Sequence, residues 1–152
     1  MYDESNIVVC TNKLVIKGDQ KDIIKLLQII RNTVAVIDFN KIIPCPNDSS
    51  QNDWNERNWG CFYNAKNSRL DYSTNDREAT IFFDTHLSPS VLVTKKMSEM
   101  FSFLDFFHSY DSEIMSVRGR QFYNHGLLEY IEEFTQDGYH WERSWIPDAS
   151  TD

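Results

Sequence analysis

Cysteine, histidine and carboxylate side chains are the groups in this sequence that could carry out catalysis or hold a metal ion. A cysteine nucleophile needs a base and an orienting group within reach of its thiolate. Asp84, expected at the end of a strand just before a helix, suits a catalytic acid or a metal ligand, but it equally suits hydrogen bonds to backbone N–H groups of the turn. Cys61 has candidate bases in four histidines, none of which forms a local catalytic signature with it: His86, His108, His125 and His140.

Motifs for metals and cofactors are missing from the sequence. Cys10, Cys45 and Cys61 are widely spaced and form no CxxC pair, so they predict neither a disulfide framework nor a zinc site. No glycine-rich phosphate loop ending in Gly-Lys-Ser or Gly-Lys-Thr occurs, and no GxGxxG pattern. We therefore expect no enzyme, no metal and no cofactor, and keep as an alternative an enzyme of unrecognised type near Trp59, Cys61 and Asp84.

Aromatic residues gather around the stretch NWGCFYNA at residues 58–65. They could form a stacking platform for a base or a peptide side chain, since aromatic rings stack and an asparagine can orient polar groups. They could equally be structural, with Trp59 plugging the open end of the sheet and Gly60 allowing a tight entry into the strand. The structural interpretation is favoured. The candidate residues are Trp54, Asn58, Trp59 and Phe62.

Arg118 and Arg120 flank Gly119 and therefore point to one face of a predicted strand. Beside aromatic residues, such arginines could contact RNA or single-stranded DNA. The alternative, two solvated arginines paired with local acids, is favoured. The net charge of −8 also opposes a nucleic-acid partner, because such proteins normally carry a basic face.

The C-terminal stretch combines acidic and aromatic residues. From residue 126 to residue 152, seven acids stand against one arginine, which gives −6 of the total −8. Such a surface suits docking onto a basic host protein. Alternatively, its aromatic residues cover the sheet and its acids are merely solvated. The candidate partner-binding residues are Glu129, Glu132, Glu133, Asp137, Tyr139, Trp141 and Trp145.

The elements that would position these groups alternate between strands and helices. Leu14 and Ile16 alternate with lysines over residues 11–18, which predicts a half-buried strand. Residues 20–32 repeat isoleucine and leucine at helical spacing after Asp19, a good N-cap. The remaining expectations are a polar connection at 33–57, strand pairs at 61–84 and 103–123, a second helix that begins near Pro89, and a short acidic helix at 127–136.

This order predicts one α+β domain. We expect a ferredoxin-like sandwich, with a mainly antiparallel sheet, two helices on one face and a C-terminal acidic helix or tail. Residues 1–125 would form the domain, and residues 126–152 an extension packed on or beside it.

Several blocks resemble the YubB-like family of plasmid- and phage-encoded proteins, over roughly residues 8–125. These blocks are VCTNKLVIKG at 9–18, FNKIIPCP at 39–46, NWGCFYNA at 58–65 and FFDTHLSPS at 82–90. The resemblance implies a ferredoxin-like domain from a mobile element and no established reaction. The chain departs from the family pattern where CFY replaces TKW and where Ser90 replaces a proline.

Together these features predict a non-enzymatic phage or mobile-element protein that binds and masks a host protein, such as a CRISPR effector. A single-stranded nucleic-acid-binding module is the first alternative. No apolar run approaches the length of a membrane span, so we expect a location in the bacterial cytoplasm. The oligomeric state does not follow from the sequence.

Overall fold

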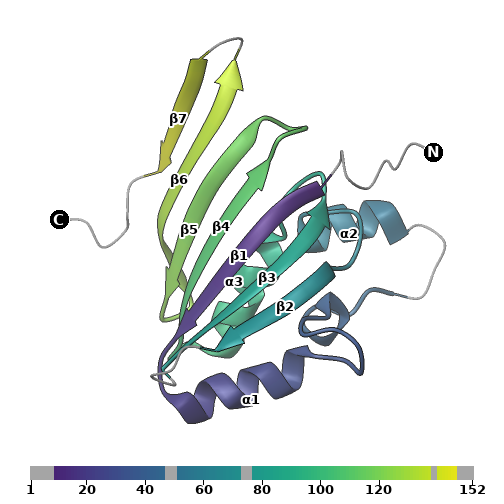
Figure 1. Cartoon of the computed structure of the whole chain (residues 1–152), viewed down its shortest axis with the longest axis vertical. Helices are drawn as coiled ribbons and strands as arrows, with labels where there is room; N and C mark the ends of the chain where they lie inside the picture. Colours follow the sequence, from purple (N-terminus) through teal and green to yellow (C-terminus); the bar gives the residue numbers. More distant parts are fainter. Residues whose placement is uncertain (1–8, 47–50, 73–76, 138–139, 147–152) are drawn as a thin grey trace.

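The computed structural model describes residues 9–46, 51–72, 77–137 and 140–146, with side chains over 9–46, 53–71 and 77–134. Seven strands form one antiparallel sheet in the order β2-β3-β1-β4-β5-β6-β7 (Figure 1). The prediction of an α+β fold with a mainly antiparallel sheet is confirmed. The elements are β1 (Val9–Lys17), α1 (Gln20–Ile30), the 3₁₀-helix η2 (Phe39–Lys41), α2 (Gln51–Trp59), β2 (Lys66–Tyr72), β3 (Glu78–His86), α3 (Val91–Met100), β4 (Asp105–Ser112), β5 (Val117–Asn124), β6 (Leu127–Asp137) and β7 (His140–Ile146).

Strand β1 lies inside the sheet, between β3 and β4, and its sequence explains its two faces. Successive side chains of a strand point to opposite faces. Leu14 and Ile16 are fully buried, whereas Lys13 and Lys17 are exposed. The predicted half-buried strand is confirmed, and its apolar face meets the core.

The core lies on the side of the sheet to which Leu14 and Ile16 point. Three α-helices, rather than the predicted two, contribute side chains to it, including Ile23 of α1, Trp59 of α2 and Met97 of α3. Figure 1 shows α1 below the sheet, α2 beside it and α3 behind β1. The side chains that point to the other side of the sheet do not take part in this core.

The long polar connection expected at residues 33–57 is only partly irregular. It contains η2 and the start of α2. The two prolines at 44 and 46 exclude a helix only up to that point, so a helix can begin at Gln51. The carboxylate of Asp38 anchors the first half by accepting hydrogen bonds from the backbone of Asn40 and the side chains of Asn32 and Asn64. Burial opposes this charge, but the three donors lower the pKa of Asp38 below its usual value.

The acidic helix predicted at residues 127–136 is wrong, because these residues form strand β6. Neighbouring side chains of β6 reach opposite faces of the sheet. Glu132 binds Arg120 on one face, and Glu133 binds Tyr110 on the other. Pairing with β5 therefore outweighs the helix propensity of leucine and glutamate. Strand β7 follows, so the C-terminal region extends the sheet away from α1 and α2 (Figure 1).

Candidate functional site

Within the described residues, no helix covers the middle of one face of the sheet, and we call this face the open face (Figure 1). Its residues alternate with the buried ones. Cross-strand pairing brings Lys13 of β1 beside Phe82 of β3 and Ser109 of β4. Ser109 in turn pairs with Arg120 of β5, and Arg120 with Glu132 of β6. The open face therefore collects side chains from five strands.

A groove of about 820 Å³ lies on the open face. This volume is within the range of ligand-binding sites. Thr11 and Ser109 are small, so they leave space between longer side chains on either side. Lys13 and Phe82 line one side of the groove. Arg118, Arg120 and Phe134 line the other.

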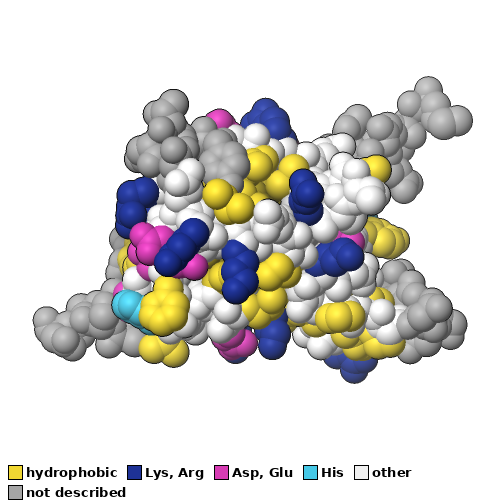
Figure 2. Space-filling view, turned by 90° about the horizontal axis from the view of Figure 1, so that it is seen from below, with side chains coloured by type: hydrophobic (Ala, Val, Ile, Leu, Met, Phe, Trp, Pro, Cys, Tyr) yellow, Lys and Arg dark blue, Asp and Glu magenta, His cyan; other side chains and the backbone are white. Residues whose placement is uncertain are grey.

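The groove carries more positive than negative side chains, in contrast to the whole chain. Three basic residues, Lys13, Arg118 and Arg120, stand against two acids, Asp111 and Glu132. The formal charge of the groove lining is therefore +1, whereas the whole chain carries −8. Figure 2 views a different side, the end of the molecule that carries α1, where lysine and arginine side chains stand among hydrophobic and some acidic ones.

Arg120 is held by two neighbours on β6. Its Nη2 lies 2.9 Å and its Nε 3.1 Å from Oε1 of Glu132, and its guanidinium lies 5.8 Å from the ring centroid of Tyr130. Interaction with Tyr130, and then the charge of Glu132, raise the pKa of Arg120 above its usual value. Arg120 therefore stays charged, with a carboxylate as its present counter-ion.

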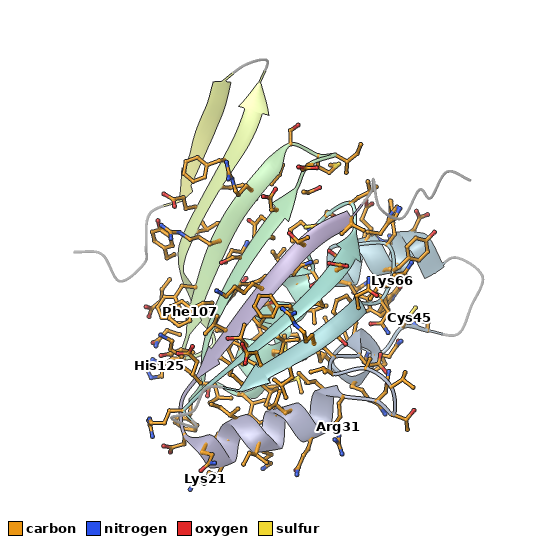
Figure 3. The ribbon with its side chains drawn as sticks, viewed as in Figure 1. Lys21, Arg31, Cys45, Lys66, Phe107 and His125 are labelled. Carbon is orange, nitrogen blue, oxygen red and sulfur yellow. The ribbon has the colours of Figure 1, made fainter. Side chains whose placement is uncertain are left out.

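Aromatic rings accompany the cations on the open face. The guanidinium carbon of Arg69 lies 4.4 Å from the ring centroid of Phe82, and the Lys13 ammonium lies 6.0 Å from the same ring. Phe107 and Phe122 stack at 4.4 Å with an interplanar angle of 15°. In Figure 3, Phe107 lies near the end of β4 at which the chain enters it. Rings beside cations can stack planar groups while the cations hold phosphates.

Sequence reasoning identified Arg118 and Arg120 in this site but missed most of its other members. Alternation placed Lys13 on the outer face of its strand, a signal that could have been used. It could not reveal that Phe82 and Ser109 are the cross-strand neighbours of Lys13.

The acidic residues predicted to bind a partner are partly engaged within the sheet. Glu132 is 7% exposed and pairs with Arg120. Glu133 accepts a hydrogen bond of 2.7 Å from the hydroxyl of Tyr110, and Glu129 is half-buried. Tyr139 lies outside the described residues. Strands β6 and β7 include Asp137, Trp141 and Trp145, whose side chains lie outside the described part.

The structure places the aromatic candidates around residues 54–62 mostly against the core. Trp59 is 2% exposed, donates from Nε1 to the carbonyl of Ile43 at 2.9 Å, and packs against Trp54. Asn58 donates to the carbonyl of Trp54. Phe62 is half-buried beside His86.

Gly60 follows Trp59 with a φ of +93°, and a Cβ there would lie 2.9 Å from the carbonyl oxygen of Pro89. A side chain at this position would therefore be strained and crowded.

The catalytic candidates are poorly placed for chemistry. Cys61 is buried, and burial raises the pKa of its thiol to about 12, so the thiolate is disfavoured at neutral pH. His108 is buried between Thr94 and Asn12, and burial lowers its pKa to about 3. Asp84 accepts a hydrogen bond from Asn67. Among the described residues, no group of three or more His, Cys, Asp or Glu side chains could hold a metal ion.

Comparisons with known proteins show the fold alone. No protein-family model matches the chain, and no curated protein does. Of solved structures, the chain is similar to the crystal structure of the protein api92 from Yersinia pseudotuberculosis, described with the family DUF1281. The TM-score is 0.54 at 17% identity, and the match covers 67% of this chain but only 41% of api92. No helix within the described part of the chain is long and apolar enough to span a membrane. At this level of identity, the chain and api92 share a fold.

Proposed function

We propose that this protein binds single-stranded nucleic acid on the open face of its sheet. The observation that carries the proposal is the groove in which Lys13, Arg118 and Arg120 stand beside Phe82 and Phe134. Phosphates are held by cations, and unpaired bases stack on exposed rings. A sheet that combines both is the arrangement used by RNA-binding domains of the split βαβ type.

The topology supports this reading. Strands β2, β3, β1 and β4 lie in the order of a ferredoxin-like βαββαβ unit, with α1 and α3 in the two crossovers. We infer that β1–β4 form a ferredoxin-like core of the YubB-like type and that β5–β7 widen its sheet. The added strands contribute Arg118, Arg120 and Phe134 to the groove.

We also propose binding without catalysis. Cys61 has a thiol whose raised pKa keeps it protonated, and His108 is buried with its two ring nitrogens engaged by Thr94 and Asn12. Neither is presented to the groove. The chain would act in the bacterial cytoplasm, where unpaired nucleic acid is available.

Fluorescence anisotropy with a labelled single-stranded oligonucleotide tests the proposal. We expect a Kd of ~10⁻⁴–10⁻⁶ M at low salt, weakening as salt rises. The double variant Lys13→Gln/Arg118→Gln should weaken binding at least tenfold, since two phosphate contacts are lost. The matched control Lys95→Gln/Lys96→Gln removes the same charge from exposed positions of α3.

Equal losses for the two double variants would contradict a role for the groove, because bulk charge alone would then explain the binding. No binding of the wild-type chain to any oligonucleotide at low salt would refute the proposal altogether.

A second candidate function is the masking of a host protein by a chain of phage or mobile-element origin, with a CRISPR effector as one possible target. The favouring observation is that β7 ends the sheet within the acidic C-terminal region. A terminal strand can pair with a partner's strand through its backbone. Capture from a bacterial host lysate should then retain a protein after nuclease treatment, and a chain ending at Asp137 should lose it. Retention that vanishes with nuclease would favour the first function.

A further inference from the structure

We propose that the bound single strand crosses the sheet roughly perpendicular to its strands, along one row of cross-strand partners. This inference rests on the proposed function and specifies the path of the ligand. The row, which we call the cationic row, consists of Arg69, Phe82, Lys13, Ser109 and Arg120.

The register of the sheet makes this row continuous. Arg69 of β2 pairs with Phe82 of β3, and Phe82 pairs with Lys13 of β1. Lys13 pairs with Ser109 of β4, and Ser109 with Arg120 of β5. Cations therefore stand on every second strand, and the row spans four strand spacings, roughly 19 Å.

Neighbouring rows of the open face are less favourable for a phosphate chain than the cationic row. On one side, Thr11 is flanked by Asp84 and Asp111, whose next cross-strand partners are Lys66 and Arg118, so the charges of this row cancel. On the other side, Val15 lies between Thr80 and Phe107, and Asp71 pairs with Thr80. Neither row beside the cationic row therefore carries a net positive charge, whereas the cationic row itself carries three cations and no acid.

The direction along β1 is also unfavourable for a phosphate chain. Lys17 is the next cation of β1 on the open face, but its Nζ lies 3.7 Å from Glu78 and its cross-strand neighbour on β4 is Asp105. A polyanion that followed β1 from Lys13 would therefore meet two carboxylates. The crosswise path meets its first carboxylate only beyond Arg120, at Glu132.

The cationic row provides separate places for the stacking of a base and for the binding of the phosphate backbone. Phe82 lies between Arg69 and Lys13, whose charged groups are 4.4 and 6.0 Å from its ring centroid, so this layer suits a stacked base. Ser109 leaves space between Lys13 and Arg120, so those two cations can hold the backbone. Arg69 does not line the groove itself, and only a ligand that extends beyond the groove reaches it.

A length series of single-stranded oligonucleotides tests this path with the full chain. For ligands of about eight nucleotides or more, we expect Arg69→Gln to weaken binding roughly fivefold and to reduce the salt slope by about 0.7. The same variant should weaken dinucleotide binding clearly less, because a dinucleotide fits within the groove, which Arg69 does not line. Lys17→Gln should change the binding of neither ligand. Arg57→Gln, at an exposed position of α2, controls for the loss of one arginine.

The contrary outcomes differ from a failure of the proposed function. A loss with Lys17→Gln but not with Arg69→Gln would place the ligand along β1 and overturn the crosswise path. Equal losses with Arg69→Gln for short and long ligands would overturn it too, since Arg69 would then act as a general charge. No binding by the wild-type chain would instead refute the proposed function itself.

Discussion

Removing the negative charge of Glu132 should strengthen nucleic-acid binding. Glu132 holds Arg120 through contacts of 2.9 and 3.1 Å to one carboxylate oxygen. A phosphate that binds Arg120 must approach this carboxylate. Glu132→Gln keeps an oxygen acceptor of the same size at the same place but removes the repulsion between the carboxylate and the phosphate.

The magnitude follows from the distance and the exposure. Two unit charges about 8 Å apart interact with about 2 kcal/mol at an effective dielectric constant of about 20. The Arg120 side chain is 64% exposed and that of Glu132 9%, so solvent and salt screening reduce the benefit to about 1 kcal/mol. This corresponds to about a fivefold lower Kd. Because Arg120 no longer shares its charge with Glu132, its phosphate contact should count in full, and the salt slope should steepen by up to about 0.7.

Anisotropy titrations at two salt concentrations measure both effects. Glu56→Gln is the matched control, because Glu56 is exposed on α2 and the substitution changes the net charge equally. Thermal unfolding should show a loss of about 1 kcal/mol or less for Glu132→Gln, since glutamine keeps an oxygen acceptor at the buried position and the 64% exposed Arg120 stays solvated. Unchanged or weaker binding by a folded Glu132→Gln variant would refute the reasoning, as would an equal gain with Glu56→Gln.

Three further predictions concern stability. His108 has a pKa of about 3 in the folded chain and about 6.5 unfolded, so the unfolded chain binds more protons between these values. The contribution of His108 to the free energy of unfolding is therefore present above pH 6.5 and should fall by about 2 kcal/mol from pH 7 to pH 5, as measured by urea titrations. His108→Gln should flatten this dependence of the free energy of unfolding on pH. An unaltered pH dependence in the variant would contradict the prediction. Gly119→Ala should lower the unfolding temperature by the equivalent of about 1–3 kcal/mol, because a Cβ would lie 2.7 Å from the hydroxyl of Tyr110; an unchanged temperature would show that the strand adjusts freely. Trp59→Phe should lower the free energy of unfolding by about 2 kcal/mol, because the hydrogen bond to Ile43 is lost and a gap is left in the core. A loss of oligonucleotide binding at unchanged stability would instead indicate a binding role for Trp59.

Local sequence patterns were sufficient for the elements that bury one regular face. The alternation of Leu14 and Ile16 with lysines defined β1, and the helical spacing of Ile23, Leu27 and Ile30 defined α1. They failed at β6, whose leucines and glutamates favour a helix in isolation. Its conformation depends on pairing with β5, a contact between different strands that no local pattern contains.

The candidate site could be anticipated only in fragments. Arg118 and Arg120 were identifiable because they flank a glycine on one strand. Their relation to Lys13 depends on a strand order in which β1 and β5 both neighbour β4, although about a hundred residues separate them in sequence. The role of Ser109 could not be predicted from the sequence, since this small residue matters only because of its cross-strand neighbours.

The most direct test of the central claim is a map of backbone amide chemical shifts as a single-stranded oligonucleotide is added to the labelled protein. We predict changes concentrated in β1, β4 and β5, around Lys13, Ser109 and Arg120, that disappear at high salt. Changes concentrated in α1, α3 or β7 would contradict the account, and so would an unchanged spectrum at low salt.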